Sequence, residues 1–503
     1  MARRSSAAPA APDPFDPART ELDGLIERLK SEEVGRMQHS EVEALVEKEG
    51  REVLRRLYQA WLELCAVRES GEPVTGSDGV ERGHRRQTGR ALTTVFGDVK
   101  VTRLHLTARG ATGGLHPLDA ELNLPPEQQS HHVQRRIGWL AANEPFDSVV
   151  ASLHETCGAE VAKRQAEFLS RRAAMDFDGF YAETVSAPVG RDHLMVLSFD
   201  GKGIVMRPED LRPATRRAAQ ASPRLAHRTS PGEKRGRKRM AQVATVYGLP
   251  VQTRTAEDIL AEFAGQHPPR PKPVNKRVWA SIEREPADVI ADAFREALGR
   301  DERRARTWVV LVDGNKDQIR FIRAQARKVG VNIVLVLDVI HVIEYLWKAA
   351  WCLYENADPA AETWVTERLK RLLEGDVSGV AAGIRRSATK RGLEPEQRYA
   401  MDKCADYLLK YKTMLRYDRY LAAGMPIATG VIEGACRHLI QDRMDVTGAR
   451  WSLDGAEAVL RLRSLRSSGD FDTYWAFHLQ QERRRFHLNR YAAHEFTHLR
   501  EAA

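Results

Sequence analysis

Cysteine is scarce and scattered in this chain. The 503 residues include five cysteines: Cys65, Cys157, Cys352, Cys404 and Cys436. No two of them form the Cys-x-x-Cys pair that is typical of thiolate zinc sites. An odd number of widely spaced thiols also argues against a disulfide framework. The sequence therefore predicts a protein of a reducing compartment.

Long apolar runs are missing as well. No stretch approaches the roughly 18 consecutive apolar residues that a membrane-spanning helix needs. Residues 1–19 carry Arg3 and Arg4 but continue in Ala, Pro and Ser, without the apolar segment of a secretion signal. We therefore expect a disordered tail there, no membrane partner and a cytoplasmic location.

Positive charge, by contrast, is plentiful. The net charge is +9, and 42% of the residues are apolar. We expect more than one domain, because single hydrophobic cores stop growing near ~250–300 residues. Residues 207–240 carry eleven Lys and Arg against three Asp and Glu, a net charge of +8. Such a run is usually a solvated surface, but it also fits the backbone of a polyanion such as DNA.

Three carboxylates stand at the edges of apolar segments. Asp200 follows the strand-like run Met195–Phe199, and Asp313 follows Trp308–Val312. Glu433 lies on a predicted helix of small residues. Two strand-end aspartates and one helical glutamate can converge on a pair of divalent cations, which clamp the attacking and leaving oxygens of a phosphodiester. Mg²⁺ suits such a site because it binds a few carboxylates and keeps its other positions for water and phosphate.

Each of these acids also has a simpler explanation. A strand-end Asp-Gly pair is more often a turn than a metal ligand. Glu433 alone is also explained as a first-turn acid favoured by the helix dipole. The order of strand Asp, strand Asp and helix Glu favours the metal site, and so do the neighbouring glycines, which let a bulky ligand approach the backbone.

Five longer blocks of sequence extend these three segments. They are Phe199–Thr215, Val312–Asn315, Ile340–Trp347, Gly430–His438 and Asp442–Trp451. In these blocks, and from about Phe96 to the C-terminal region, the chain resembles the insertion-sequence transposases of the ISKra type, within the Mutator-like DDE group.

The resemblance implies a DNA transposase with an RNase H-like catalytic core. Its DDE acids would be Asp200, Asp313 and Glu433, holding two Mg²⁺ (or Mn²⁺) ions. The implied partners are double-stranded DNA, as terminal inverted repeats and as target, and further copies of the chain in a homodimer or larger assembly. The implied location is the nucleoid of a bacterium. Two alternatives stay open: a non-catalytic DNA-binding regulator on a transposase scaffold, and a nuclease without strand transfer.

The predicted fold class is multidomain α/β, with an RNase H-like mixed sheet interrupted by an all-helical insertion and preceded by helical and helix-turn-helix-like regions. The expected parts are a disordered tail (1–19), a helical region (20–75), a hairpin with a helix-turn-helix-like domain (76–190), the catalytic core (191–356, with the basic insert 207–240), the helical insertion (357–424), the second part of the core with Glu433 (425–466) and a basic helical region (467–503).

Local patterns also predict individual strands and helices. Residues 91–106 alternate like a hairpin, with Gly97-Asp98 as the expected turn. Helices are expected over 133–142, 146–154 and 160–175, the last as a DNA-recognition helix or simply as part of a trihelical domain. The core strands are expected at 194–199, 204–206 (pairing back on the first), 242–247, 308–312 and 331–337.

Four residues near the acids are candidate auxiliary groups. His341, with Asp338, would contact DNA or orient a water, or Asp338 would simply cap a helix. Arg437 would bind the scissile phosphate, with His438 beside it. The alternative is an intrahelical pair of Glu433 with Arg437.

Twelve basic residues are candidate DNA contacts: Lys163, Arg164, Lys202, Arg207, Arg216, Arg217, Arg235, Arg237, Lys238, Arg239, Arg443 and Arg450.

Overall fold

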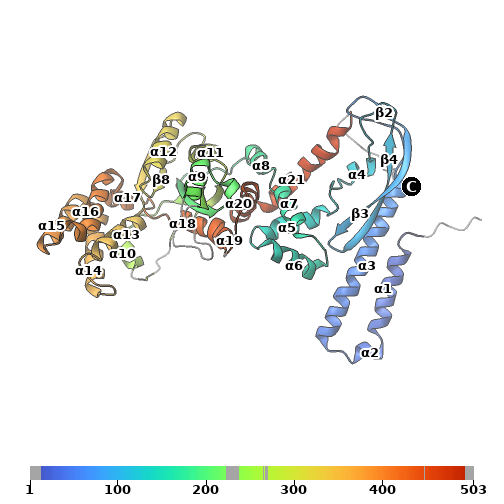
Figure 1. Ribbon diagram of the computed structural model, residues 1–503, viewed down its shortest axis with the longest axis horizontal. Helices are drawn as coiled ribbons and strands as arrows, with labels where there is room; N and C mark the ends of the chain where they lie inside the picture. Colours follow the sequence, from blue (N-terminus) through green and yellow to red (C-terminus); the bar gives the residue numbers. More distant parts are fainter. Residues whose placement is uncertain (1–12, 222–236, 264, 267–269, 447, 493–503) are drawn as a thin grey trace, which may run out of the picture. The chain divides into compact units, whose positions relative to one another are not determined.

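The computed structural model describes residues 13–221, 237–263, 265–266, 270–446 and 448–492 (Figure 1). The chain divides into two compact units. Unit 1 is Met1–Tyr181 with Phe471–Ala503, and unit 2 is Ala182–Asp470. In the part of the chain described, no helix combines the length and the apolar character that crossing a membrane requires.

Unit 1 begins with helices and a long hairpin. The helices are α1 (Asp16–Leu29), α2 (Glu32–Gly35) and α3 (His39–Arg68). The strands are β1 (Val74–Thr75), β2 (Glu81–Arg82), β3 (His84–Thr94) and β4 (Gly97–Thr107). The predicted hairpin is confirmed, but its expected turn is wrong: Gly97 already pairs with Thr94. Thr94 closes the turn earlier, because its hydroxyl accepts from the Phe96 N–H and donates to the Gly97 carbonyl.

The second half of unit 1 is helical. It contains α4 (Pro117–Glu121), α5 (His131–Ala141), α6 (Phe146–Cys157), α7 (Lys163–Ala173), α8 (Phe177–Glu183), α21 (Phe471–Phe486) and a 3₁₀ turn at Leu488–Arg490. Helices α5, α6 and α7 close around one apolar core that includes Ile137, Leu153 and Leu169. Gly158 ends α6 in the left-handed conformation. The three predicted helices are therefore confirmed, while DNA recognition by α7 stays a prediction.

Unit 1 buries several histidines as neutral rings, which leads to a pH prediction. Burial lowers the pKa values of His116, His131 and His487 from 6.5 to about 4. Because the folded state holds these rings neutral, they contribute to the free energy of unfolding. This contribution is complete above pH 6.5 and is lost as the pH falls from 6.5 through 4. We expect the melting temperature of unit 1 to fall over that window, and less steeply in His487→Gln, whose amide can still donate to the Leu124 carbonyl.

Exposed His154 in the same unit provides the control. A His154→Gln protein should keep the wild-type slope of melting temperature against pH. If the melting temperatures of wild type and His487→Gln fall equally steeply with decreasing pH, the buried ring does not cause the acid sensitivity.

Unit 2 is built on a mixed five-stranded sheet in the order β7-β6-β5-β8-β9. Its strands are β5 (His193–Val205), β6 (Lys238–Pro250), β7 (Val274–Ser281), β8 (Trp308–Val312) and β9 (Ile333–Leu337). β5, β6 and β7 pair antiparallel, whereas β8 and β9 run parallel to β5. The multidomain α/β prediction holds at this level.

One strand prediction is wrong, and one strand was missed. Residues 204–206 do not pair back on the first strand, because β5 continues through Gly201 and Gly203 to Val205 and pairs with β6 throughout. Neither glycine takes a positive φ, so the chain does not turn there. β7 was not predicted at all. Only its second half is apolar, since the strand begins in the polar segment Val274–Arg277.

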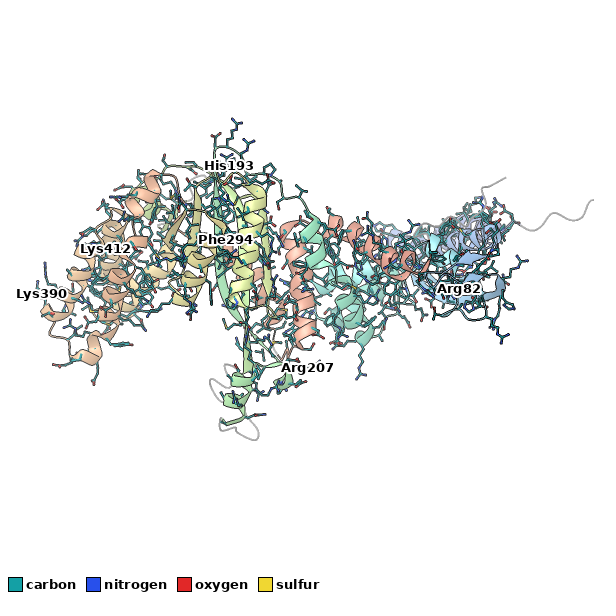
Figure 2. All side chains as sticks on the ribbon, turned by 90° about the horizontal axis from the view of Figure 1, so that it is seen from above. Arg82, His193, Arg207, Phe294, Lys390 and Lys412 are labelled. Atoms are coloured by element: carbon teal, nitrogen blue, oxygen red, sulfur yellow. The ribbon has the colours of Figure 1, made fainter. Side chains whose placement is uncertain are left out.

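Helices surround this sheet. They are α9 (Pro213–Ala221), α10 (Ala256–Phe263), α11 (Pro286–Arg300), α12 (Lys316–Val329), α13 (Val339–Ala350), α18 (Gly430–Cys436), α19 (Asp442–Met444) and α20 (Leu453–Ser468). α11 and α18 both pack on β5 and β6. Phe294 of α11 is fully buried and lies against Trp308 of β8, with ring centroids 5.8 Å apart (Figure 2).

The predicted insertion at 357–424 is helical over most of its length. It contains α14 (Pro359–Leu373), α15 (Val377–Lys390), α16 (Pro395–Lys410), a 3₁₀ turn η3 (Lys412–Met414) and α17 (Tyr417–Ala422). α16 packs on α13, which follows the last strand of the sheet. The insertion is thus attached close to the end of β9.

Helix α20 covers the β7 edge of the sheet. The backbone N–H groups of Val278 and Ala280 donate to the hydroxyls of Ser468 and Ser464 at 3.0 and 3.3 Å. The Ile282 N–H donates to the buried carboxylate of Glu457 at 2.9 Å. Side chains of one helix therefore satisfy the donors that an edge strand usually leaves open.

Candidate active site

Three aspartates lie in one row across the parallel strands. The parallel pairing of β5 with β8 ends at Ser198 and Leu311, and Asp200 and Asp313 each lie two residues beyond that pair. The pairing of β8 with β9 ends at Val312 and Leu337, and Asp313 and Asp338 each lie one residue beyond that pair. Adjacent strands lie about 4.8 Å apart. The strand register therefore brings Asp200, Asp313 and Asp338 to the edge of the sheet at which β8 and β9 end. The predicted strand-end position is wrong for Asp200, because β5 continues past it to Val205.

Asp338 is the fully buried member of this row. Its Oδ1 accepts from the Ile340 N–H at 3.2 Å, which caps α13, and from the Thr429 N–H at 3.1 Å. Its Oδ2 lies 2.8 Å from Nδ1 of His341. The helix-cap prediction for Asp338 is confirmed, but this carboxylate also fixes the loop that leads into α18.

Glu433 enters the site from that loop. Thr429 donates its hydroxyl to Glu433 Oε1 at 3.3 Å. Asp338, His341 and Glu433 each offer a ligand atom, and these three atoms all lie within 4.8 Å of one another. The helical acid is therefore next to the row of aspartates, and we call Asp200, Asp313, Asp338, His341 and Glu433 the acidic centre.

The carboxylates of the acidic centre repel one another. Burial raises the pKa of Glu433 above its usual value, and the charges of Asp338 and Asp200 raise it further. The hydrogen bond to Asp338 raises the pKa of His341 to about 9, helped by the charges of Asp313 and Glu344. A divalent cation would relieve this crowding, and carboxylate oxygens are its preferred ligands. The residues present therefore fit a site for Mg²⁺ or Mn²⁺.

Cys436 belongs to the site, although no sequence motif selected it. Its Sγ donates to Asp200 Oδ2 at 3.1 Å. Burial raises the pKa of the thiol, and the charge of Asp200 raises it further, so the group stays protonated and can donate. The sequence feature that could have identified Cys436 is its position three residues after Glu433, on the same face of the helix.

Two tyrosines of the insertion hold the loop after β8. The hydroxyl of Tyr407 donates to the Asp313 carbonyl at 2.9 Å, and that of Tyr411 donates to the Gly314 carbonyl. Gly314 has a φ of +96°, and a Cβ there would lie 3.2 Å from both rings. The close approach explains the glycine, and it means that the insertion positions Asp313.

The side chains of Arg437 and His438 are exposed and pair with Asp442. Their side chains are 73% and 69% exposed, and both lie near Asp442, at 3.8 and 3.1 Å. In a continuous α-helix, Arg437 and Gln441 would follow Glu433 along one face, but Arg437–Gln441 is π-helical. A π turn holds more residues than an α turn, so the i, i+4, i+8 spacing no longer applies.

Several predicted DNA contacts are occupied within the protein. Arg443 is 3% exposed and lies over the Trp451 ring, so its prediction is wrong; burial lowers its pKa to about 10, and Arg463 adds to the effect. Arg216 donates to the Pro208 carbonyl and Arg239 to the Ile282 carbonyl, at 3.0 and 2.9 Å. Lys163 pairs with Asp147 at 2.6 Å.

Other predicted contacts are better placed. Lys202 lies two residues after Asp200 on β5, hence on the same face of the sheet. Besides Lys163, the exposed members of the predicted set are Arg164, Arg207 (Figure 2), Arg217 and Arg450. Arg237 and Lys238 are half-buried, with Lys238 3.9 Å from Asp445. Arg235 and the middle of the basic insert, residues 222–236, lie outside the described residues.

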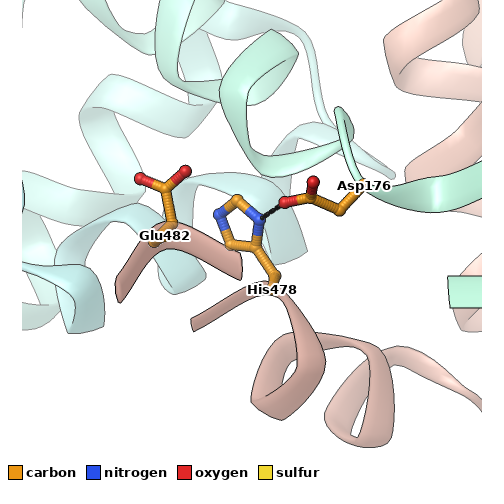
Figure 3. Close-up of side chains that lie close together, drawn as sticks. All are labelled: Asp176, His478 and Glu482. Atoms are coloured by element: carbon orange, nitrogen blue, oxygen red, sulfur yellow. Dashed lines mark hydrogen bonds and ion pairs between the residues drawn. The ribbon is translucent and has the colours of Figure 1, made fainter. Parts of the chain in front are cut away.

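A second cluster of ligand-type side chains lies in unit 1 (Figure 3). Buried His478 lies 2.7 Å from Asp176, and Glu482 is one helical turn further along α21. Both carboxylates already pair with guanidinium groups, Asp176 with Arg485 and Glu482 with Arg172. We therefore interpret this cluster as an ion-pair network that fixes α21 within unit 1.

Comparison with known proteins assigns the chain to no family. No protein-family model matches the chain, and no curated protein matches it either.

Proposed function

We propose that the chain is a DDE-type DNA transposase that cuts and joins phosphodiesters at an RNase H-like core. The strand order supports this proposal. Numbered along unit 2, the sheet has the order 3-2-1-4-5, with the first three strands antiparallel and the last two parallel to the first. An RNase H-like core would have a sheet of this order, and the helical insertion precedes the glutamate-bearing helix α18.

One observation carries the proposal: Asp200 and Asp313 each lie two residues beyond the last pair of the neighbouring parallel strands β5 and β8, and the charge of Asp200 acts on Glu433. Asp200, Asp313 and Glu433 would hold the two ions, with Asp338 as a buried neighbour. Bound there, such ions lower the pKa of a water and stabilise charge on the attacking and leaving oxygens.

The other groups of the site have supporting roles. Cys436 and Thr429 donate to Asp200 and Glu433 and so orient the two carboxylates. The hydrogen bond to Asp338 raises the pKa of His341 and orients its ring, which would donate to a phosphate oxygen. Lys202, on the face of β5 that bears Asp200, supplies positive charge for the DNA backbone.

The reaction has two steps. Water adds to the phosphorus at the transposon end, the P–O3′ bond breaks, and the 3′-oxygen takes up a proton. The freed 3′-hydroxyl then attacks a phosphodiester of the target, forming one bond and breaking another. Because two ends must be held together, we expect a homodimer or larger assembly on DNA.

The test is cleavage of a supercoiled plasmid that carries the element's terminal inverted repeats. We expect nicks at the repeat ends with Mg²⁺ or Mn²⁺ and none with EDTA. End binding without cleavage under any metal condition would favour the regulatory alternative. Cleavage without joined products would favour a nuclease.

A further inference from the structure

A cleft of about 580 Å³ lies beside the β9 edge of the sheet in unit 2. Arg323 and Arg327 of α12 form one wall, and Arg416 and Arg419 at α17 form the other. The floor is the first part of β9, residues 333–335. The cleft is separate from the acidic centre, since Asp338 follows the other end of β9.

All charge in the lining of this cleft is positive. No Asp or Glu belongs to it, and all four arginine side chains are exposed. Among the residues that the structure describes, none of these four guanidinium groups has an ion-pair or hydrogen-bond partner. Like charges four residues apart, as in Arg323 and Arg327, destabilise a helix. This cost is offset when an anion binds between the two walls.

We propose that the cleft binds the sugar-phosphate backbone of a single nucleic-acid strand, as a second nucleic-acid site of the proposed transposase. Arginine suits this role because its planar fork binds phosphate oxygens in pairs. The volume is that of a small-ligand pocket, so it takes one strand and not a duplex. The apolar floor of Ile333, Val334 and Leu335 fits sugars and base faces.

An acidic peptide would need a different surface. A peptide that extends the sheet bonds to free backbone groups of an edge strand. On β9 the outward carbonyls of Leu335 and Leu337 already accept from the hydroxyls of Tyr420 and Tyr417, at 3.3 and 2.8 Å. Strand addition is therefore disfavoured, whereas phosphate binding by the arginines needs neither carbonyl.

The cleft also leads toward the acidic centre. Ile333 and Asp338 are five residues apart along β9, which is about 16 Å in an extended strand. A single strand held between the arginine walls therefore has its next nucleotides within reach of Asp313 and Glu433. The connection between the cleft and the acidic centre rests on the proposed function, whereas the binding of a single strand in the cleft does not.

The experiment measures binding of a fluorescent 20-nucleotide oligo(dT) by anisotropy, with full-length protein in EDTA over a range of salt. In the variant Arg323→Gln/Arg327→Gln/Arg416→Gln/Arg419→Gln, we expect at least tenfold weaker binding at low salt. The slope of log affinity against log salt should fall by about 3, at ~0.7 per neutralised phosphate of a single strand.

A matched control removes the same charge elsewhere in unit 2. Lys272, Lys276, Arg386 and Lys390 are exposed and lie outside the cleft, with Lys272 and Lys276 at or near the β7 edge (Figure 2 labels Lys390). Their glutamine variant should bind nearly as wild type. Replacing the four cleft arginines by lysine keeps the charge but not the planar fork, so it should restore the salt slope and part of the affinity, which excludes misfolding as the cause.

Three results would overturn the proposal: unchanged binding in the cleft variant, an equal loss in the control variant, or cleft-dependent binding of polyglutamate without binding of oligo(dT). Failure of the proposed function is distinguishable. A protein that never cleaves DNA but loses oligo(dT) only through the cleft arginines would keep this inference and refute the transposase.

Discussion

Replacing Asp200 or Asp313 by Asn, or Glu433 by Gln, should abolish metal-dependent strand cleavage, with a rate loss of more than ~10³-fold, or ~4 kcal/mol of barrier. Each change keeps the shape of the side chain and removes the negative charge that a cation needs. Asp200 and Asp313 each lie two residues beyond the last pair of β5 and β8, and the charge of Asp200 acts on Glu433. Single-turnover cleavage of plasmid DNA with Mg²⁺ measures the loss, and DNA binding should be nearly unchanged.

Glu344 offers a matched control for this experiment. It is an exposed carboxylate on α13, its charge raises the pKa of His341, and it lies 3.5 Å from Lys348. Glu344→Gln should therefore cleave at close to the wild-type rate. Full activity in any of the three acid variants would show that the replaced residue is not part of the metal site. A large loss of activity in Glu344→Gln would show that Glu344 belongs to the metal site.

Asp338→Ala should lower the free energy of unfolding of unit 2 by about 3 kcal/mol. The substitution leaves the buried N–H groups of Ile340 and Thr429 without their acceptor and removes the partner of His341. Each unsatisfied buried donor costs ~1–3 kcal/mol. Urea unfolding, followed by a signal from unit 2, measures the change.

A second cap aspartate separates the two roles of Asp338. Asp358 caps α14 through one hydrogen bond, from the Ala360 N–H at 2.9 Å, and it is partly exposed. Asp358→Ala should cost only the ~0.5–2 kcal/mol of an ordinary cap. Equal losses in the two variants would show that the bond from Asp338 to the Thr429 loop contributes nothing to stability.

The sequence alone located the strands that carry the site acids. Trp308–Val312 is a continuous apolar run, and Met195–Phe199 is apolar except for Ser198, as expected of strands buried on both faces. An aspartate directly follows each run, and local pattern is enough to show that. The insertion was equally accessible, because apolar residues recur there at helical spacing.

Features that depend on distant pairs were not accessible in this way. The central position of Asp338 follows from the register of β8 with β9 and from Thr429, which is 91 residues away in the sequence. Cys436 meets Asp200 across 236 residues. β5 continues through Asp200-Gly201 because β6 pairs with it there, and this pairing overrides the local preference of Asp-Gly for a turn.

Helix α20, which covers the β7 edge of the sheet, is synthesised long after β7, and this delay has a consequence for folding of the nascent chain. Ile282 is made 175 residues before Glu457, the residue that accepts its N–H. At about 5–20 residues per second, the edge of β7 stays open for roughly 10–35 s on the ribosome. An open edge pairs readily with other strands. We therefore expect nascent chains that stop before α20 to depend on chaperones and to aggregate without them.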